Sequence, residues 1–127
     1  MQDRVTYEYA VIRLVPKVER EEFINIGVMI FSKPKRYIGI KYKIDEKKVK
    51  AFSEDLDIDT ITSYLKAWED VCEGAPKGGS IGEFDMASRF RWLTASRSTI
   101  IQSSKTHIGM CTNPAEVLQD LYEYYVL

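Results

Sequence analysis

The densest group of side chains suited to ligand binding lies between Arg89 and His107. The stretch from Met86 to Ala115 contains four Lys and Arg residues and no Asp or Glu. Guanidinium groups, hydroxyls and an imidazole donate hydrogen bonds to phosphates and carboxylates, and an acid-free neighbourhood leaves their charge uncompensated. We therefore expect an anion site in this segment. Its donors are Arg89, Arg91, Arg97, Ser98, Thr99, Gln102, Lys105, Thr106 and His107.

A structural role for the same arginines is the alternative. Arg89 and Arg91 would then pair with Glu116, Asp120 and Glu123 of a C-terminal helix, while the hydroxyls satisfy turn backbones. Exposed charges are usually solvated or loosely paired, so this interpretation stays open beside the anion site.

Arg13 stands alone as a charged residue in the apolar run from Tyr9 to Val15. A buried guanidinium needs a partner, and Glu22 and Asn25 begin the next strand, across the expected hairpin. We predict that Arg13 contacts Glu22 as a structural ion pair. If these residues line a cleft beside Arg91 instead, they would hold a substrate or a side chain of a partner.

Several other chemistries lack the residues they require. His107 and Cys111 offer only two close zinc ligands, and as a thiol–base pair they lack a third, orienting group. The Asp-rich segment 55–59 resembles the start of a calcium loop, but the sixth position is Thr60 and the twelfth is Lys66. We expect no metal and no cofactor.

Length and composition indicate one globular domain over residues 1–127. Hydrophobic residues make up 45% and charged residues 29%, and the net charge of −1 disfavours general binding to nucleic acid. The longest apolar run is too short to cross a membrane, and no signal peptide opens the chain. We therefore expect a cytoplasmic protein with no membrane contact, in which the two cysteines, Cys72 and Cys111, are reduced.

The apolar pattern predicts an α+β fold with a mostly antiparallel sheet. Alternation indicates a three-strand N-terminal meander, from Tyr7 to Val15, Ile24 to Phe31 and Tyr37 to Ile44. The first of these strands is apolar on both sides, so it should be central or covered on both faces. A later strand is expected within Ser98 to Ser103, with a further edge from His107 to Met110. We expect the helices to pack on one face of the sheet.

Helical spacing follows the meander. Val49 and Phe52 indicate two short turns, and a clear helix runs through Ile61 to Cys72 with Asp59 as its cap. The glycine-rich segment 75–82 is typical of a mobile loop, and Met86 to Leu93 fits a short helix. Asn113 and Pro114 mark the start of a last helix, with Leu118 and Leu121 on its apolar face. We predict that Trp68, Leu65, Leu118 and Leu121 are buried.

Two sequence blocks resemble a known bacterial family. The first comprises Tyr9 to Pro16 and Arg20 to Val28, and the second runs from Phe90 to Ser103. They look like the signature blocks of the family called domain of unknown function 3037, and the resemblance extends from about Tyr7 to the C-terminus. It implies a small companion protein, since some members are similar in gene setting to accessory partners of a HipA-like Ser/Thr kinase. The polar residues matched in these blocks are Arg13, Glu22, Asn25, Arg91, Arg97, Ser98 and Gln102.

Residues and resemblance together suggest a non-catalytic binding or regulatory protein. Its basic polar cleft would accept a small anionic ligand or a partner such as a HipA-like kinase. The alternative is an enzyme that processes a phosphodiester or nucleotide, in which Arg91 and Arg97 stabilise charge and His107 or Glu22 transfers protons. The expected binding residues are Arg13, Glu22, Asn25, Arg91, Arg97, Ser98, Gln102 and His107.

Overall fold

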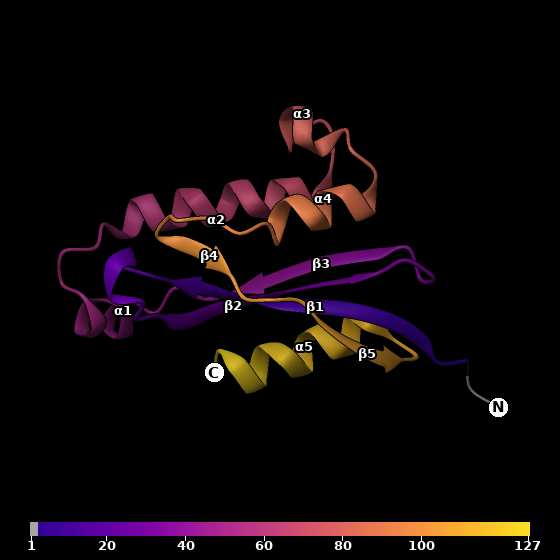
Figure 1. Ribbon diagram of the computed structural model, residues 1–127, viewed down its shortest axis with the longest axis horizontal. Helices are drawn as coiled ribbons and strands as arrows, with labels where there is room; N and C mark the ends of the chain where they lie inside the picture. The colour runs from indigo at the N-terminus through magenta and orange to yellow at the C-terminus, as the bar shows by residue number, and fades with distance from the viewer. Residues whose placement is uncertain (1–2) are drawn as a thin grey trace.

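The alternating N-terminal residues form a meander of three antiparallel strands (Figure 1). In the computed structural model, which describes residues 3–127, these are β1 (Val5–Leu14), β2 (Ile24–Ser32) and β3 (Tyr37–Tyr42). Two later strands, β4 (Ile101–Ser103) and β5 (His107–Cys111), pair antiparallel with β1 along its other edge. The path through the sheet is β3-β2-β1-β4, with β5 continuing the line of β4.

Ser104 marks the break between β4 and β5. Its backbone N–H donates to the Val11 carbonyl at 2.8 Å, and its hydroxyl accepts from the Val11 N–H at 2.8 Å. The hydroxyl therefore takes the place of a strand carbonyl, and β1 stays paired while the neighbouring chain shifts from one strand to the next.

Helices cover both faces of the sheet. Ala10, Ile12 and Leu14 face the layer of α2 (Ile58–Glu73) and α4 (Met86–Leu93), whereas Val11 joins the cluster beneath α5 (Pro114–Tyr125). Figure 1 shows α2 and α4 above the sheet and α5 below it. The expectation that helices pack on one face is thus corrected, because strands that are apolar on both sides need cover on both. The central, doubly covered position expected for β1 is confirmed.

Local signals set the ends of the helices. Asn113 accepts from the N–H groups of Ala115 and Glu116 at the start of α5, with Pro114 as its first helical residue. The cap of α2 is Asp57 rather than Asp59, whose N–H donates to the Asp57 carboxylate. The remaining helices are η1 (Val18–Arg20), α1 (Glu46–Phe52) and the single turn α3 (Gly79–Gly82) inside the glycine-rich segment.

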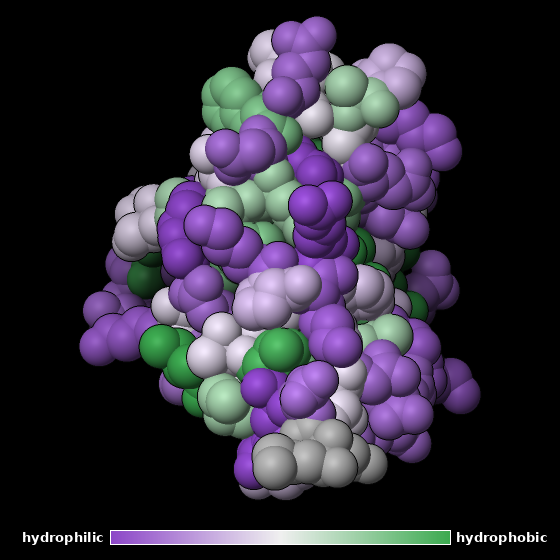
Figure 2. Space-filling model, turned by 90° about the vertical axis from the view of Figure 1, so that its right-hand side faces the viewer, coloured by the Kyte–Doolittle hydropathy of each residue, from purple (hydrophilic) through white to green (hydrophobic). Residues whose placement is uncertain are grey.

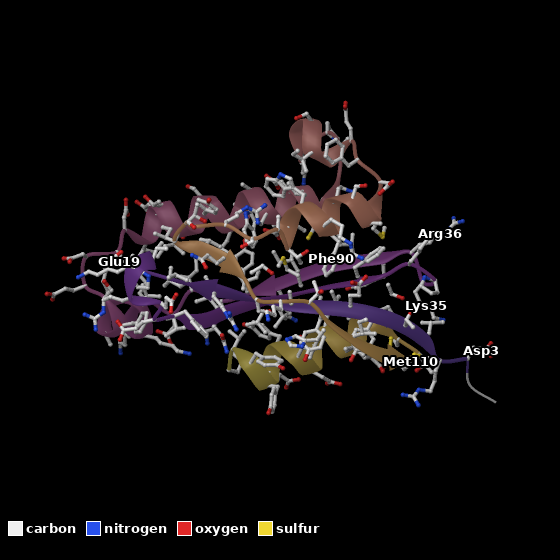
Figure 3. The ribbon with its side chains drawn as sticks, viewed as in Figure 1. Asp3, Glu19, Lys35, Arg36, Phe90 and Met110 are labelled. Atoms are coloured by element: carbon white, nitrogen blue, oxygen red, sulfur yellow. The ribbon has the colours of Figure 1, made fainter. Side chains whose placement is uncertain are left out.

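The core agrees with the predicted burial. Leu65, Trp68 and Leu118 are buried, while Leu121 is partly buried against the smaller cluster. Phe90 on α4 points into the sheet, as Figure 3 shows. No helix within residues 3–127 is both long enough and apolar enough to span a membrane.

Candidate functional site

Arg13 lies at the C-terminal end of β1, where the pairing with β2 is irregular. The register shifts between Ile12 and Arg13, and Arg13 is opposite Asn25 on β2 and Gln102 on β4. The Phe23 ring centroid is 4.1 Å from the guanidinium carbon, which gives a cation–π contact. The Arg13 Nε atom is buried and has no hydrogen-bond partner in the described part of the chain. Within the described residues, Arg13 therefore contacts the Phe23 ring and has no carboxylate partner.

A cleft of about 430 Å³ opens beside Arg13. Its walls come from the end of β1, the connection to β2, the segment after α4, and β4. The cleft is open to solvent, and Arg13, Arg97 and Gln102 bring N–H donors to its lining. Its lining residues are Arg13, Val15, Val18, Glu21, Phe23, Arg97, Ser98 and Gln102.

Arg97 is held in the cleft wall by the end of α4. Its guanidinium donates to the carbonyl of Leu93 at 3.0 Å and to that of Trp92, which also accepts from the Ala95 N–H at 3.4 Å. The same group stacks on two indole rings, with its central carbon 5.0 Å from the Trp68 centroid and 4.6 Å from that of Trp92. Burial lowers the pKa of Arg97 from its ordinary value.

Gln102 and Ser98 add neutral polar groups. The Gln102 amide donates to the Thr99 carbonyl at 2.8 Å, which orients the side chain and leaves its oxygen out of that bond. Ser98 is exposed, in the connection between α4 and β4. Arg13, Arg97, Ser98 and Gln102 thus come together from distant parts of the sequence, as four of the eight expected binding residues.

Glu22 does not contact Arg13, so the predicted ion pair is wrong. Its carboxylate accepts from Arg20 Nε at 2.5 Å, and this bond lowers the pKa of Glu22. The cause is the short turn η1, which ends at Glu21 with a left-handed φ of 57°. The turn brings Phe23 over Arg13 and leaves Glu22 exposed on another concave surface, beside Lys17 and Arg20.

Asn25 also lies outside the cleft. Its side-chain amide donates to the Tyr125 carbonyl at 3.4 Å, at the C-terminal end of α5. Although Asn25 is opposite Arg13 in the strand register, it lines a separate hollow beside Lys43 and Lys48. The contact ties β2 to α5 and supplies no group to Arg13.

Arg91 forms a two-pronged ion pair with Glu8. Both contacts, from Nη1 to Oε1 and from Nη2 to Oε2, are 2.9 Å, and they raise the pKa of Arg91. Arg89 instead donates to the carbonyls of Val71 and Cys72 near the end of α2. Both arginines thus bond to groups of the described chain, but not to Glu116, Asp120 or Glu123, so the partners that the alternative named are wrong.

His107 is exposed at the sheet edge, with its ring centroid 5.0 Å from that of Tyr9. A hydrogen bond between the hydroxyls of Tyr9 and Tyr125, together with burial, raises the pKa of Tyr9 to about 12. His107 and Cys111 occupy the two ends of β5, roughly 13 Å apart for an extended strand, so imidazole and thiol do not meet. Both cysteines are free and buried.

Phe23 and Glu21 are cleft residues that the sequence interpretation missed. Phe23 is 43% exposed although it is a large aromatic residue. It directly precedes β2, the strand opposite Arg13, and this position was the signal that could have identified it. The left-handed conformation of Glu21 has no comparable signal, because it depends on the turn that precedes β2. No cluster of three metal-binding side chains occurs in residues 3–127.

Fold and cleft together define a small α+β protein whose antiparallel sheet carries a cleft with two arginines near the C-terminal end of β1. The chain belongs to the family described as "Protein of unknown function (DUF3037)", which matches residues 9–126. The resemblance of the two signature blocks is thereby confirmed. Searches of curated proteins and of solved structures returned no significant match.

Proposed function

We propose that this protein is a non-catalytic binding module whose cleft at Arg13 accepts a small anion or an anionic side chain of a protein partner. The observation that carries the proposal is that Arg13 lines the cleft without a salt bridge, while its buried Nε lacks a hydrogen-bond partner among residues 3–127. A buried donor without an acceptor costs about 1–3 kcal/mol. An anion in the cleft supplies the counter-charge that the Arg13 guanidinium lacks within the described residues.

Charge supports the same proposal. Arg13 and Arg97 both line the cleft, against the single carboxylate of Glu21. The bonds of Arg97 go to neutral carbonyl oxygens, which orient its guanidinium without neutralising it. Neither arginine has a salt bridge within the part of the chain that the structure describes. A positive charge held in a concave surface attracts anions, and guanidinium groups match phosphate and carboxylate geometry.

The size of the cleft suits a small molecule or the end of a side chain. A volume of about 430 Å³ lies at the lower end of the range of ligand pockets. Phe23 offers an apolar ring beside the cationic group, and Val15 and Val18 add apolar wall. An anion that carries a flat or apolar body therefore has both parts accommodated.

Calorimetric titration with a panel of anions tests the proposal. Inorganic phosphate, a nucleoside monophosphate and a phosphoserine peptide serve as probes. We expect at least one probe to bind wild-type protein, with an affinity that weakens at least tenfold in Arg13→Met and falls with added salt. Arg91→Gln is the matched control, because it also removes one guanidinium but lies outside the cleft, and it should bind normally. Equal weakening by both variants would contradict the proposal.

A HipA-like kinase is the protein partner that the family resemblance implies, and it stays a proposal. Under this proposal, both proteins are in the cytoplasm, and the kinase places an acidic or phosphorylated side chain in the Arg13 cleft. Co-purification from the native host should retain a kinase on wild-type protein and lose it on Arg13→Met. Retention of the kinase by that variant would contradict the cleft as its binding site.

The enzyme alternative gains no support from the geometry. His107 is on β5 beside Tyr9, Glu22 is paired with Arg20, and Arg91 is paired with Glu8. None of these residues lines the Arg13 cleft, so the proton-transfer groups of that alternative are separated from Arg97.

A further inference from the structure

β5 has an open backbone edge. On one side it pairs with β1 from Tyr9↔His107 to Val5↔Cys111, and within residues 3–127 it pairs with no other strand. Every second residue of an edge strand directs its N–H and C=O groups away from the sheet. Another strand is the occupant that satisfies such a row of donors and acceptors.

The devices that normally protect an edge are missing from β5. Proteins protect edge strands with proline or with charged residues, above all Lys, and β5 has no Pro, Lys, Arg, Asp or Glu between His107 and Cys111. Its face toward α4 instead presents Ile108, which is 77% exposed, and Met110, which is 47% exposed. By comparison, the opposite edge strand, β3, carries the exposed Lys41 and packs against α2 and α5.

The apolar surface continues from β5 onto the sheet. Met110 is opposite Thr6, which together with Phe31 and Met86 lines a shallow groove of about 850 Å³ whose rim also holds Lys33, Arg36 and Asp85. Figure 3 shows Met110 at the end of the molecule where the chain begins, and Figure 2, which looks onto that end, shows green apolar surface among the hydrophilic residues. The Arg91–Glu8 pair beside this surface is neutral as a unit, so it does not repel a second protein.

We infer that β5 pairs antiparallel with β5 of a second copy of this chain, about a two-fold axis at Gly109. In this register Ile108 is opposite Met110 of the second copy, and the reverse contact repeats it, so four exposed apolar side chains cover one another. Because the apolar residues of β5 match those of a second β5 in this register, we assign a second copy of the chain to the open edge. Two five-stranded sheets thereby become one continuous sheet of ten strands.

Gly109 and Lys105 fit this register. A Cβ atom at Gly109 would lie 2.5 Å from the Tyr7 ring, so the tyrosine covers the glycine, which itself adds no side chain at the centre of the pair. Lys105 is just outside β5, and the antiparallel arrangement puts the two lysines at opposite ends. The net charge of −1 per chain adds little repulsion between copies.

Sedimentation equilibrium over about 10 µM to about 1 mM, the range of weak contacts, tests the pairing. Wild-type protein should rise toward twice its monomer mass. The I108K/M110K variant should remain monomeric, with its dimer dissociation constant raised at least about tenfold, because like charges then oppose each other across the axis. Tyr124→Lys is the control, since it removes an 80% exposed aromatic residue from α5 and should dimerise normally. A monomeric wild type, or a dimeric I108K/M110K, overturns the inference.

A charge-swap variant tests the register itself. In I108K/M110E each new lysine is opposite a new glutamate of the second copy, so dimerisation should return and should strengthen at low salt. Dimerisation of wild type combined with a monomeric I108K/M110E overturns the register at Gly109. Both side chains are exposed in the monomer, so each variant should fold normally. Thermal melts in the same buffers check this.

Discussion

Arg13, Arg91 and Arg97 carry the same side chain, and their surroundings give each a different role. Arg91 has a carboxylate partner in Glu8, and Arg97 has the carbonyls at the end of α4. Arg13 has an aromatic ring for its guanidinium plane, but its Nε has no acceptor in the described residues. Arg13 lines the cleft and has no carboxylate partner in the described residues, so it is the arginine that we assign to binding.

Arg13→Met should leave the protein as stable as wild type or make it about 1 kcal/mol more stable. Methionine keeps the apolar stem against Phe23 and removes the buried N–H that lacks an acceptor. Urea denaturation measures the free energy of unfolding. A loss of more than about 2 kcal/mol would mean that Arg13 is a stabilising contact, in conflict with its assignment to ligand binding.

Arg97→Lys should lower the free energy of unfolding by about 1–3 kcal/mol. Lysine keeps the charge but loses the planar fork that reaches the carbonyls of Trp92 and Leu93 and stacks between two indole rings. The same denaturation experiment measures the loss. Stability equal to wild type would show that the fork geometry does not matter at this position.

Tyr42 predicts a specific response to alkaline pH. Burial and the hydrogen bond to Glu69 at 2.9 Å raise the pKa of Tyr42 from about 10 to about 12. The folded state therefore holds this proton more tightly, and its stabilising contribution is complete below pH 10 and is lost as the pH rises toward 12. Unfolding free energies measured across that window should fall less steeply in Tyr42→Phe than in wild type. Parallel curves would contradict the shift.

At the scale of elements, periodicity was the reliable signal. The alternation in β1 to β3 and the 3.6-residue spacing of α2 and α5 follow from which faces are buried, so the sequence patterns predicted these elements. The strand expected over Ser98 to Ser103 is shorter, since β4 begins only at Ile101. The path of the loop before β4 depends on the contacts of Arg97 with the end of α4. Local propensity does not encode such contacts.

Leu118→Ala tests the docking of α5. Leu118 packs in the cluster with Val28 and Ile30, and its Cδ2 atom is so close to Gly39 that a Cβ there would lie 2.9 Å away. The substitution should cost about 2–5 kcal/mol through the cavity that it leaves. A change under about 0.5 kcal/mol in denaturant melts would contradict the packing of α5 on the sheet.

Gly39→Ala provides the matched control for that contact. Alone it should destabilise the protein, because the new methyl group collides with Leu118 and Tyr37. In the presence of Leu118→Ala its cost should be smaller, since the cavity accepts the methyl group. Strictly additive costs in the double variant would mean that α5 and β3 do not meet at this point.

At the scale of the whole molecule, the sheet brings together residues that are distant in the chain. Arg13 from β1 and Gln102 from β4 meet because β4 returns to the free edge of β1, which is a long-range pairing. Sequence reasoning identified both residues and their polar neighbours Arg97 and Ser98. It also grouped Arg91 and His107 with them. In the structure, however, Arg91 is paired with Glu8 and His107 is opposite Tyr9, so both lie nearer the middle of β1 than Arg13 does. Strand order decides which of these residues meet, and strand order was unresolved from the sequence.

The most direct test of the Arg13 cleft is an amide NMR titration of wild-type protein with the tightest-binding anion. We expect chemical-shift changes to concentrate at Arg13, Arg97, Ser98 and Gln102, and to shrink with added salt. The amides of Arg91 and His107 should stay unchanged. Shifts centred on Arg91 and His107, or no shift at any cleft amide at millimolar anion, would contradict the assignment of this cleft as the binding site.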